Sequence, residues 1–176
     1  MIKNIFLTGP PGCGKTTLIK EILKELKLKA GGFFTEEIRE RGIRKGFKII
    51  TLDGKEGILA HVDIKSQLKV SKYGVNLKDL EEIGVKEIEK NLKENFLIVV
   101  DEIGKMEIFS SKFREAILKA LNSKNKILGT IMLKENPFCD KIKKRKDTKV
   151  FYLTRENREK VKKEILCLFQ SLQKKK

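Results

Sequence analysis

Residues 9–16 constrain what this chain can fold into more than any other part of its sequence. They read Gly-Pro-Pro-Gly-Cys-Gly-Lys-Thr and follow a short apolar segment, residues 2–8, that predicts a strand. A helix is expected over residues 16–28, because four apolar side chains recur there at helical spacing: Leu18, Ile22, Leu23 and Leu26. A glycine-rich turn between a strand and a helix is the setting in which backbone amides bind phosphate groups. The sequence therefore predicts a phosphate-binding loop.

The residue types in this loop each have a physical reason. Gly12 and Gly14 leave room for phosphate oxygens beside the backbone, and Gly9 permits a tight exit from the strand. Lys15 is expected to reach the β- and γ-phosphates of a nucleotide, and the Thr16 hydroxyl to ligate Mg²⁺. We expect the nucleotide-binding loop to consist of these residues: Gly9, Pro10, Pro11, Gly12, Cys13, Gly14, Lys15, Thr16 and Thr17.

A second group of candidates follows the apolar run at residues 96–100, which predicts a strand buried on both faces of a parallel sheet. Asp101 and Glu102 come directly after it, at the carboxyl end of a strand expected beside the first one. We expect Asp101 to hold Mg²⁺ through water, and Glu102 to act as the general base that activates the attacking water. The catalytic candidates are thus Lys15 and Glu102, and the metal candidates are Thr16 and Asp101.

Several further residues stay open between a functional and a structural role. Thr130 ends a predicted strand, which lies either between the two motif-bearing strands with the hydroxyl near the γ-phosphate, or elsewhere. Lys105 and Glu107 either touch nucleotide or water, or lie in an exposed loop of mixed charge. Three arginines either supply positive charge to the γ-phosphate or form an exposed basic face: Arg39, Arg41 and Arg44.

Strands and helices alternate along most of the chain, which predicts an α/β fold with a mostly parallel central sheet flanked by helices. Residues 31–60 differ, because β-type segments separated by glycines predict two or three inserted antiparallel strands, joined to the main sheet or kept apart as a docking surface. Further helices are expected at residues 77–92, from Ser110 or Ser111 to 121, at 137–144 and from Thr154 onwards, and further strands at 127–133 and 150–153. We expect one P-loop NTPase domain over residues 1–173 and a basic tail at 174–176.

Composition limits the classes of protein that fit. The run of five apolar residues at 96–100 is far shorter than the roughly 20 that a membrane-spanning helix needs, and the N-terminus lacks the features of a secretory signal, so we expect a soluble, cytoplasmic protein. Three cysteines without a CxxC pair and a single histidine, His61, argue against a disulfide framework and a zinc site. Abundant Lys, Glu and Ile beside three Gln are typical of thermophile proteins.

The net charge of +16 is concentrated toward the C-terminus, where residues 134–176 hold 15 basic and 6 acidic residues. Such a distribution favours a polyanionic partner, so a nucleic-acid-stimulated ATPase is one alternative function. No recognised nucleic-acid motif supports it. The first alternative, ahead of that one, is a nucleoside or nucleotide kinase, which would need an arginine-rich lid. The best place for a lid is residues 31–60, yet these are expected to form ordered hairpins.

Taken together, these residues resemble the small P-loop nucleoside-triphosphate phosphatases of thermophiles, whose animal relatives are called cancer-related nucleoside triphosphatases. The resemblance spans nearly the whole chain. It is carried by the segments GPPGCGKTTL, GGFFTEEIRERGIRKGFKI, VVDEIGKMEIFS, ILGTI and IKKRKDTKVFYLTRENRE. The resemblance implies Mg²⁺-dependent hydrolysis of the γ-phosphate of ATP, GTP and other nucleoside triphosphates with little selectivity for the base.

The resemblance also implies which residues contact the nucleotide. Besides the phosphate loop, it places contacts on a second run: Ile98, Val99, Val100, Asp101, Glu102, Ile103, Gly104 and Lys105. Arg145 matches a recurring family position and either stacks on a base or lies exposed. Broad base tolerance fits the sequence, which contains no Asn-Lys-x-Asp motif for reading guanine. Turnover should be slow if no arginine is placed at the γ-phosphate. The oligomeric state is left open.

Overall fold

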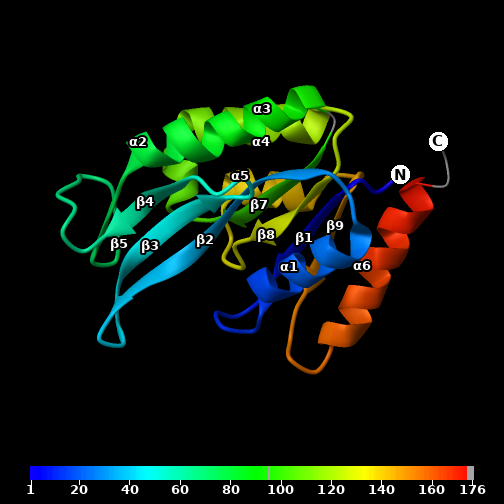
Figure 1. Cartoon of the computed structure of the whole chain (residues 1–176), viewed down its shortest axis with the longest axis horizontal. Helices are drawn as coiled ribbons and strands as arrows, with labels where there is room; N and C mark the ends of the chain where they lie inside the picture. The colour runs from blue at the N-terminus through cyan, green and yellow to red at the C-terminus, as the bar shows by residue number, and fades with distance from the viewer. Residues whose placement is uncertain (95, 174–176) are drawn as a thin grey trace.

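The computed structural model describes residues 1–94 and 96–173 and shows helices packed on both faces of one sheet (Figure 1). Within these residues the sheet has nine strands in the order β5-β6-β4-β3-β2-β7-β8-β1-β9. The expected α/β class and the expected flanking helices are confirmed. The predicted basic tail at 174–176 lies outside the described residues.

The strands alternate with helices along most of the chain. The strands are β1 (Asn4–Thr8), β2 (Ala30–Glu40), β3 (Ile43–Thr51), β4 (Glu56–His61), β5 (Lys69–Val70), β6 (Tyr73–Val75), β7 (Leu97–Ile103), β8 (Ile127–Ile131) and β9 (Thr148–Tyr152). The helices are α1 (Lys15–Leu26), α2 (Leu77–Asp79), α3 (Lys86–Glu94), α4 (Ser111–Asn122), α5 (Pro137–Lys143) and α6 (Arg158–Gln173). A π-helical turn, η1 (Leu80–Val85), joins α2 to α3, and a 3₁₀ turn, η2 (Glu107–Phe109), precedes α4.

Five strands form the parallel part of the sheet. β1 pairs in parallel with β8 on one side and β9 on the other, and β7 pairs in parallel with β8 and β2. The strand that carries Thr130 therefore lies between the two motif-bearing strands, as one of the two predicted alternatives has it. The expectation that the Asp101 strand lies directly beside the first strand is wrong, because β8 separates them.

The inserted segment continues the main sheet. β2 pairs in parallel with β7 through residues 30–33 and in antiparallel fashion with β3 through residues 33–40. β4, β6 and β5 extend the sheet further, each antiparallel to its neighbour. The antiparallel part thus reaches residue 75, beyond the predicted 31–60. β5 and β6 have only two and three residues, too few for a periodic pattern to reveal them.

The alternation of side chains along the strands produces one core on each face of the sheet. Ile5 and Leu7 pack with apolar residues of α1 and α6, whereas Phe6 packs with residues of α3 and α4. The two helix layers lie on opposite sides of the sheet in Figure 1. On the α4 side, the fully buried Phe113 ring lies 6.4 Å from the Phe33 ring. Among the described residues, no helix combines the length and apolar character that crossing a bilayer requires.

The structure adds detail to two predicted helices, the one at residues 77–92 and the one that begins at Ser110 or Ser111. The predicted helix at 77–92 contains the π-helical turn η1, in which a side chain at Gly84 would meet Ile49 at 2.6 Å and Phe33 at 3.3 Å. Glycine therefore lets this turn pack directly on the sheet. For α4, Ser110 rather than Ser111 is the N-cap, because its hydroxyl accepts a hydrogen bond from the Phe113 amide at 3.1 Å.

Replacing Phe113 by alanine should lower the free energy of unfolding by about 3–5 kcal/mol, because a fully buried ring leaves a cavity between α4 and the sheet. Leu118→Ala is the matched control, since Leu118 lies on the same helix and is 44% exposed, and it should change stability by less than about 0.5 kcal/mol. Denaturant unfolding of both variants measures the difference. Equal losses would contradict the assigned core.

Candidate active site

The phosphate loop connects β1 to α1 and has the backbone that its sequence requires. Gly14 precedes α1 with φ of 91°, a left-handed conformation that residues with side chains rarely adopt. A Cβ atom at Gly9 would lie 2.6 Å from the carbonyl oxygen of Leu153, so only glycine fits there. No side chain caps the N-terminus of α1. Its first amide groups are therefore free to bind an anion.

Lys15 folds back over this loop. Its ammonium group donates hydrogen bonds to the carbonyl oxygens of Gly9 at 3.1 Å and Pro10 at 3.0 Å. Both contacts lie within the loop itself and hold the ammonium beside the free amides of α1. The loop therefore gathers a full positive charge and several N–H donors in one place, which suits the phosphate chain of a nucleotide.

Asp101 connects the loop to the acid pair on β7. The Thr16 hydroxyl donates to Asp101 Oδ2 at 2.5 Å, and the Thr130 hydroxyl on β8 donates to Asp101 Oδ1 at 2.5 Å. The residue is only 3% exposed. The structure therefore brings together two candidates, Thr16 and Asp101, that lie 85 residues apart in sequence, and places Thr130 against the same carboxylate.

Glu107, left open by the sequence, lies inside the site. It is 4% exposed, and its Oε2 atom accepts a hydrogen bond from the Gly104 amide at 3.1 Å. A side chain at Gly104 would meet Glu102 at 2.7 Å and Glu107 at 3.0 Å, so both carboxyl groups lie against this glycine. The interpretation of Glu107 as part of an exposed loop is wrong, whereas Lys105 is exposed and lines the cavity that also contains Lys15 and Glu102.

Burial changes the acidity of all three carboxyl groups. Burial raises the pKa of Asp101, and the hydrogen bonds from Thr130 and Thr16 partly oppose this effect. Burial also raises the pKa of Glu102, with a further contribution from the charge of Asp101. For Glu107, burial and then the charge of Glu102 raise the pKa to about 8. A cluster of carboxyl groups this close is a place where a bound cation is stabilising.

The donor atoms at Thr16 and Asp101 fit magnesium. A hydroxyl and a carboxylate are hard oxygen donors, and Mg²⁺ is typically held by one or two protein groups together with substrate phosphates and water. Within residues 1–94 and 96–173, no group of three or more His, Cys, Asp or Glu side chains is arranged to hold a metal ion by itself. The site thus suits an ion that arrives with a phosphorylated ligand better than a metal enclosed by protein.

A cavity of about 470 Å³ opens above these groups. Its lining combines the phosphate loop, the segment after the acid pair and the antiparallel part of the sheet, and it includes Lys15, Glu102, Glu107, Glu37, Arg44 and Phe47. Glu37 and Phe47 were not expected at the site, because only the pairing of β2 with β3 brings them to the phosphate loop. No sequence signal distinguishes them from other residues of alternating strands.

The structure separates the three arginine candidates. Arg44 lines the cavity that also contains Lys15 and Glu102, while Arg39 and Arg41 do not. Arg39 instead binds Glu37 and the carbonyl oxygen of Gly42. Arg41 lies in the exposed turn between β2 and β3. Of these three arginines, Arg44 alone lines the cavity that adjoins the phosphate loop.

The suggested contact of Arg145 with a base is wrong. Arg145 precedes β9, and the first residue of β9 is paired with the first residue of β1. Arg145 therefore lies at one end of the parallel strands and the phosphate loop at the other. Its guanidinium donates to both carboxylate oxygens of Asp147, at 2.9 and 3.0 Å, and to the Leu121 carbonyl. This arrangement ties α4 to the start of β9 and is structural.

Arg158 lies beside the phosphate loop, although no sequence pattern marked it as a candidate site residue. A side chain at Gly14 would come within 3.8 Å of its Nε atom, and its guanidinium makes two hydrogen bonds to Glu21 on α1, at 2.7 and 3.1 Å.

The predicted start of the last helix at Thr154 is four residues early. Residues 154–157 form a turn in which Thr154 and Asn157 exchange hydrogen bonds, and α6 begins at Arg158.

The remaining predicted nucleotide contacts fall into two groups. Some are fully buried in the cores and support the acid pair without lining the cavity: Ile98, Val99, Val100 and Ile103. On the loop, Cys13 packs into the core of α1 and α6, whereas Pro10, Gly12 and Thr17 are exposed. Most residues of the loop are therefore expected to contact a phosphate through their backbone amides rather than their side chains.

Known proteins resemble this chain over most of its length. The profile of the NTPase family, described as "NTPase", matches residues 4–166. Nucleoside-triphosphatase THEP1 of Thermotoga petrophila is 56% identical over 167 residues, covering 95% of this chain and 93% of the relative. The cancer-related nucleoside-triphosphatase of Homo sapiens is 39% identical over 190 residues, covering 99% of this chain and 100% of the relative.

A solved structure agrees with the fold. The crystal structure of THEP1 from the hyperthermophile Aquifex aeolicus matches this chain with a TM-score of 0.85 and 37% identity, covering 94% of this chain and 98% of the other. The match extends over the P-loop NTPase architecture expected from the sequence. The chain therefore belongs to the NTPase family, together with these nucleoside-triphosphatases.

Proposed function

We propose that this chain hydrolyses the γ-phosphate of nucleoside triphosphates, with Mg²⁺ as cofactor, with broad tolerance for the base and at a slow rate. The observation that carries the proposal is the hydrogen bond of 2.5 Å between Thr16 on the phosphate loop and Asp101 on β7. It sets the acid pair beside the loop, and Glu102 lines the same cavity as Lys15. The relatives' names, which describe nucleoside-triphosphatases, support the same reaction.

The mechanism assigns one task to each group of residues. The amides at the start of α1 and the Lys15 ammonium bind the β- and γ-phosphate oxygens and hold the phosphate chain in line. Thr16 and Asp101 would hold Mg²⁺, which neutralises charge on these oxygens when bound. Glu102 accepts the proton of the attacking water at its carboxylate, and the buried Glu107, which accepts a hydrogen bond from the Gly104 amide, adds a second carboxyl group beside it. No covalent intermediate is required.

Two observations support the finer parts of the proposal. The lining of the cavity includes one aromatic side chain, Phe47, and the Arg44 guanidinium covers its ring at 5.2 Å, so no aromatic pair is placed there to select a base. Arg44 is itself held by Glu37 at 2.8 Å and by the Tyr73 hydroxyl at 3.0 Å. Because Nε and Nη1 are held by these partners, at most Nη2 of Arg44 is left for a ligand, which supports slow hydrolysis.

A kinase activity is less well supported. Phosphoryl transfer to an acceptor needs a lid that closes over both substrates. The segment that offered the best place for a lid is paired along its length, as strands β2, β3 and β4 of the main sheet, in keeping with the ordered hairpins expected there.

Purified protein with Mg²⁺ should release free phosphate from ATP, GTP, CTP and UTP at rates within about tenfold of one another. Phosphate release should stop when EDTA removes the metal. Parallel reactions contain nucleoside acceptors or RNA. Phosphate that appears only on an acceptor would establish a kinase, and release that requires RNA would establish a nucleic-acid-stimulated ATPase. Either result would overturn the proposal.

Replacing Lys15 by alanine should lower nucleotide affinity and turnover together, with turnover reduced about 100-fold or more, because the ammonium binds both the ground state and the transition state. Fluorescent nucleotide titration and phosphate release measure the two effects. Lys20→Ala is the control, because Lys20 lies on the same helix and pairs with Glu36 outside the cavity. Unchanged binding in the Lys15 variant would remove the phosphate loop from the mechanism.

The Glu102→Gln substitution keeps the shape of the side chain and removes the proton acceptor. We expect nucleotide binding to remain within about threefold of the original, while the rate of hydrolysis falls by about 10²–10⁴-fold. Glu135→Gln, at an exposed residue after β8, is the control and should change neither quantity. A Glu102 variant that retains its rate would require another base.

A further inference from the structure

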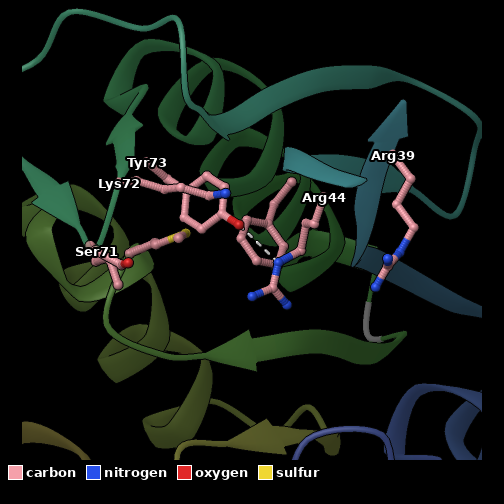
Figure 2. Close-up of a pocket in the computed structure, with 8 residues that line it drawn as sticks. Arg39, Arg44, Ser71, Lys72 and Tyr73 are labelled. Carbon is pink, nitrogen blue, oxygen red and sulfur yellow. Dashed lines mark hydrogen bonds between the residues drawn. The ribbon is translucent and has the colours of Figure 1, made fainter. Parts of the chain in front are cut away.

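A second cavity, which we call the extension pocket, adjoins the first. It has a volume of about 550 Å³ and lies between the β2–β3 hairpin and the turn that joins β5 to β6 (Figure 2). It shares four lining residues with the cavity of the active site: Arg44, Phe47, Val70 and Met106. The mechanism above gives this pocket no task. A ligand bound in it would still be in reach of Arg44, which both cavities share.

The lining of the extension pocket is cationic. Arg39, Arg44 and Lys72 line it, and no carboxylate among the described residues does so. Arg39 and Arg44 share a single carboxylate, Glu37, at 2.6 and 2.8 Å. Lys72 has no ion pair among the described residues, and its ammonium lies 5.6 Å from the centre of the Tyr73 ring. Three positive charges therefore face one negative charge, and the excess favours an anion.

Aromatic rings hold the Arg44 guanidinium in a fixed orientation. It lies 5.2 Å from the Phe47 ring and 5.7 Å from the Tyr73 ring, and these rings meet edge to face at 5.3 Å. Its Nε atom donates to the Tyr73 hydroxyl at 3.0 Å, the contact drawn in Figure 2. Nη1 binds Glu37, and Nη2 has no hydrogen-bond partner among the described residues. A guanidinium that is both oriented and incompletely paired is prepared for an oxyanion.

The turn between β5 and β6 supplies further donors. Ser71 and Lys72 form this turn and both line the pocket, and Figure 2 shows them on one side of Arg44 with Arg39 on the other. A hydroxyl-bearing residue, a lysine and an arginine thus line the same pocket. This donor set matches a tetrahedral phosphate, whose oxygens accept several charged hydrogen bonds at once. A flat apolar ligand would leave these donors unpaired.

We propose that the extension pocket binds a phosphate group through Arg44, Lys72 and Ser71. The phosphate is either the one released at the neighbouring active site, in which case the inference rests on the proposed function, or the phosphate of a second small molecule. Because Arg44 lines both cavities, an occupant of the extension pocket draws on the same guanidinium as a ligand of the active site. Occupation of the pocket therefore changes the charge that Arg44 presents at the wall of the active site.

The test measures phosphate binding with the phosphate loop disabled. The Lys15→Ala protein is titrated with inorganic phosphate and with phenyl phosphate by calorimetry, alone and combined with Lys72→Gln or Arg44→Gln. Each second substitution should weaken binding by about tenfold or more, because one charged hydrogen bond is lost. Lys69→Gln is the matched control, since Lys69 is an exposed lysine on β5 that does not line the pocket.

The two ligands distinguish the two sources. Binding of inorganic phosphate that equals or exceeds binding of phenyl phosphate, together with weaker product inhibition in the Lys72→Gln enzyme, assigns the pocket to the released phosphate. Tighter binding of phenyl phosphate assigns it to a second molecule. Lys72 is exposed on a turn, so its variant should fold even if the Arg44 variant does not.

Two outcomes would overturn the inference. One is phosphate affinity that Lys72→Gln leaves unchanged, and the other is phosphate binding that Lys15→Ala alone abolishes. The proposed function is judged separately, by phosphate release from nucleoside triphosphates in the original protein. A chain that binds phosphate in the pocket without hydrolysing nucleotides would retain the inference and lose the function, and the reverse result would do the opposite.

Discussion

The arrangement of the site depends on one buried carboxylate. Asp101 receives a hydroxyl group at each oxygen, from Thr16 and from Thr130, and so joins α1, β7 and β8 at one point. Breaking either contact would leave one oxygen of this almost solvent-free carboxylate without its hydrogen-bond donor, which is costly. The distance between the phosphate loop and Glu102 is therefore fixed by the same contacts that satisfy Asp101. Structural integrity and the placement of the reacting groups cannot be separated here.

The second constraint is the continuity of the sheet. A P-loop architecture supplies the loop and the acid pair from parallel strands, but the opposite wall of the cavity comes from antiparallel strands attached through β2. Arg44 and Phe47 reach the site only because β3 pairs with β2. The cationic wall and its neighbouring pocket are thus products of the added strands, and they give this fold a surface that the parallel part alone would lack.

The sequence predicted the parts that depend on local pattern. The phosphate loop, the helical spacing of α1 and the apolar run of β7 follow from short motifs and periodicity, and the role suggested for β8 followed from the order of strands in such folds. Pattern could not place Glu107, because a buried glutamate in a 3₁₀ turn resembles an exposed one in sequence. Nor could it separate Arg44 from Arg41, since their difference arises from strand pairing. Arg145 was misplaced because the pairing of β9 with β1, which sets it at the end of the strands away from the phosphate loop, cannot be seen in its local sequence.

β2 belongs to both halves of the sheet, and this has a consequence for the way in which substrate enters. Residues 30–33 of the strand are bonded to β7, and residue 33 already pairs with β3, so the wall that carries Arg44 shares backbone bonds with the floor that carries Asp101. A nucleotide that enters the cleft therefore meets a wall and a floor that are joined at their base by the backbone hydrogen bonds of one strand.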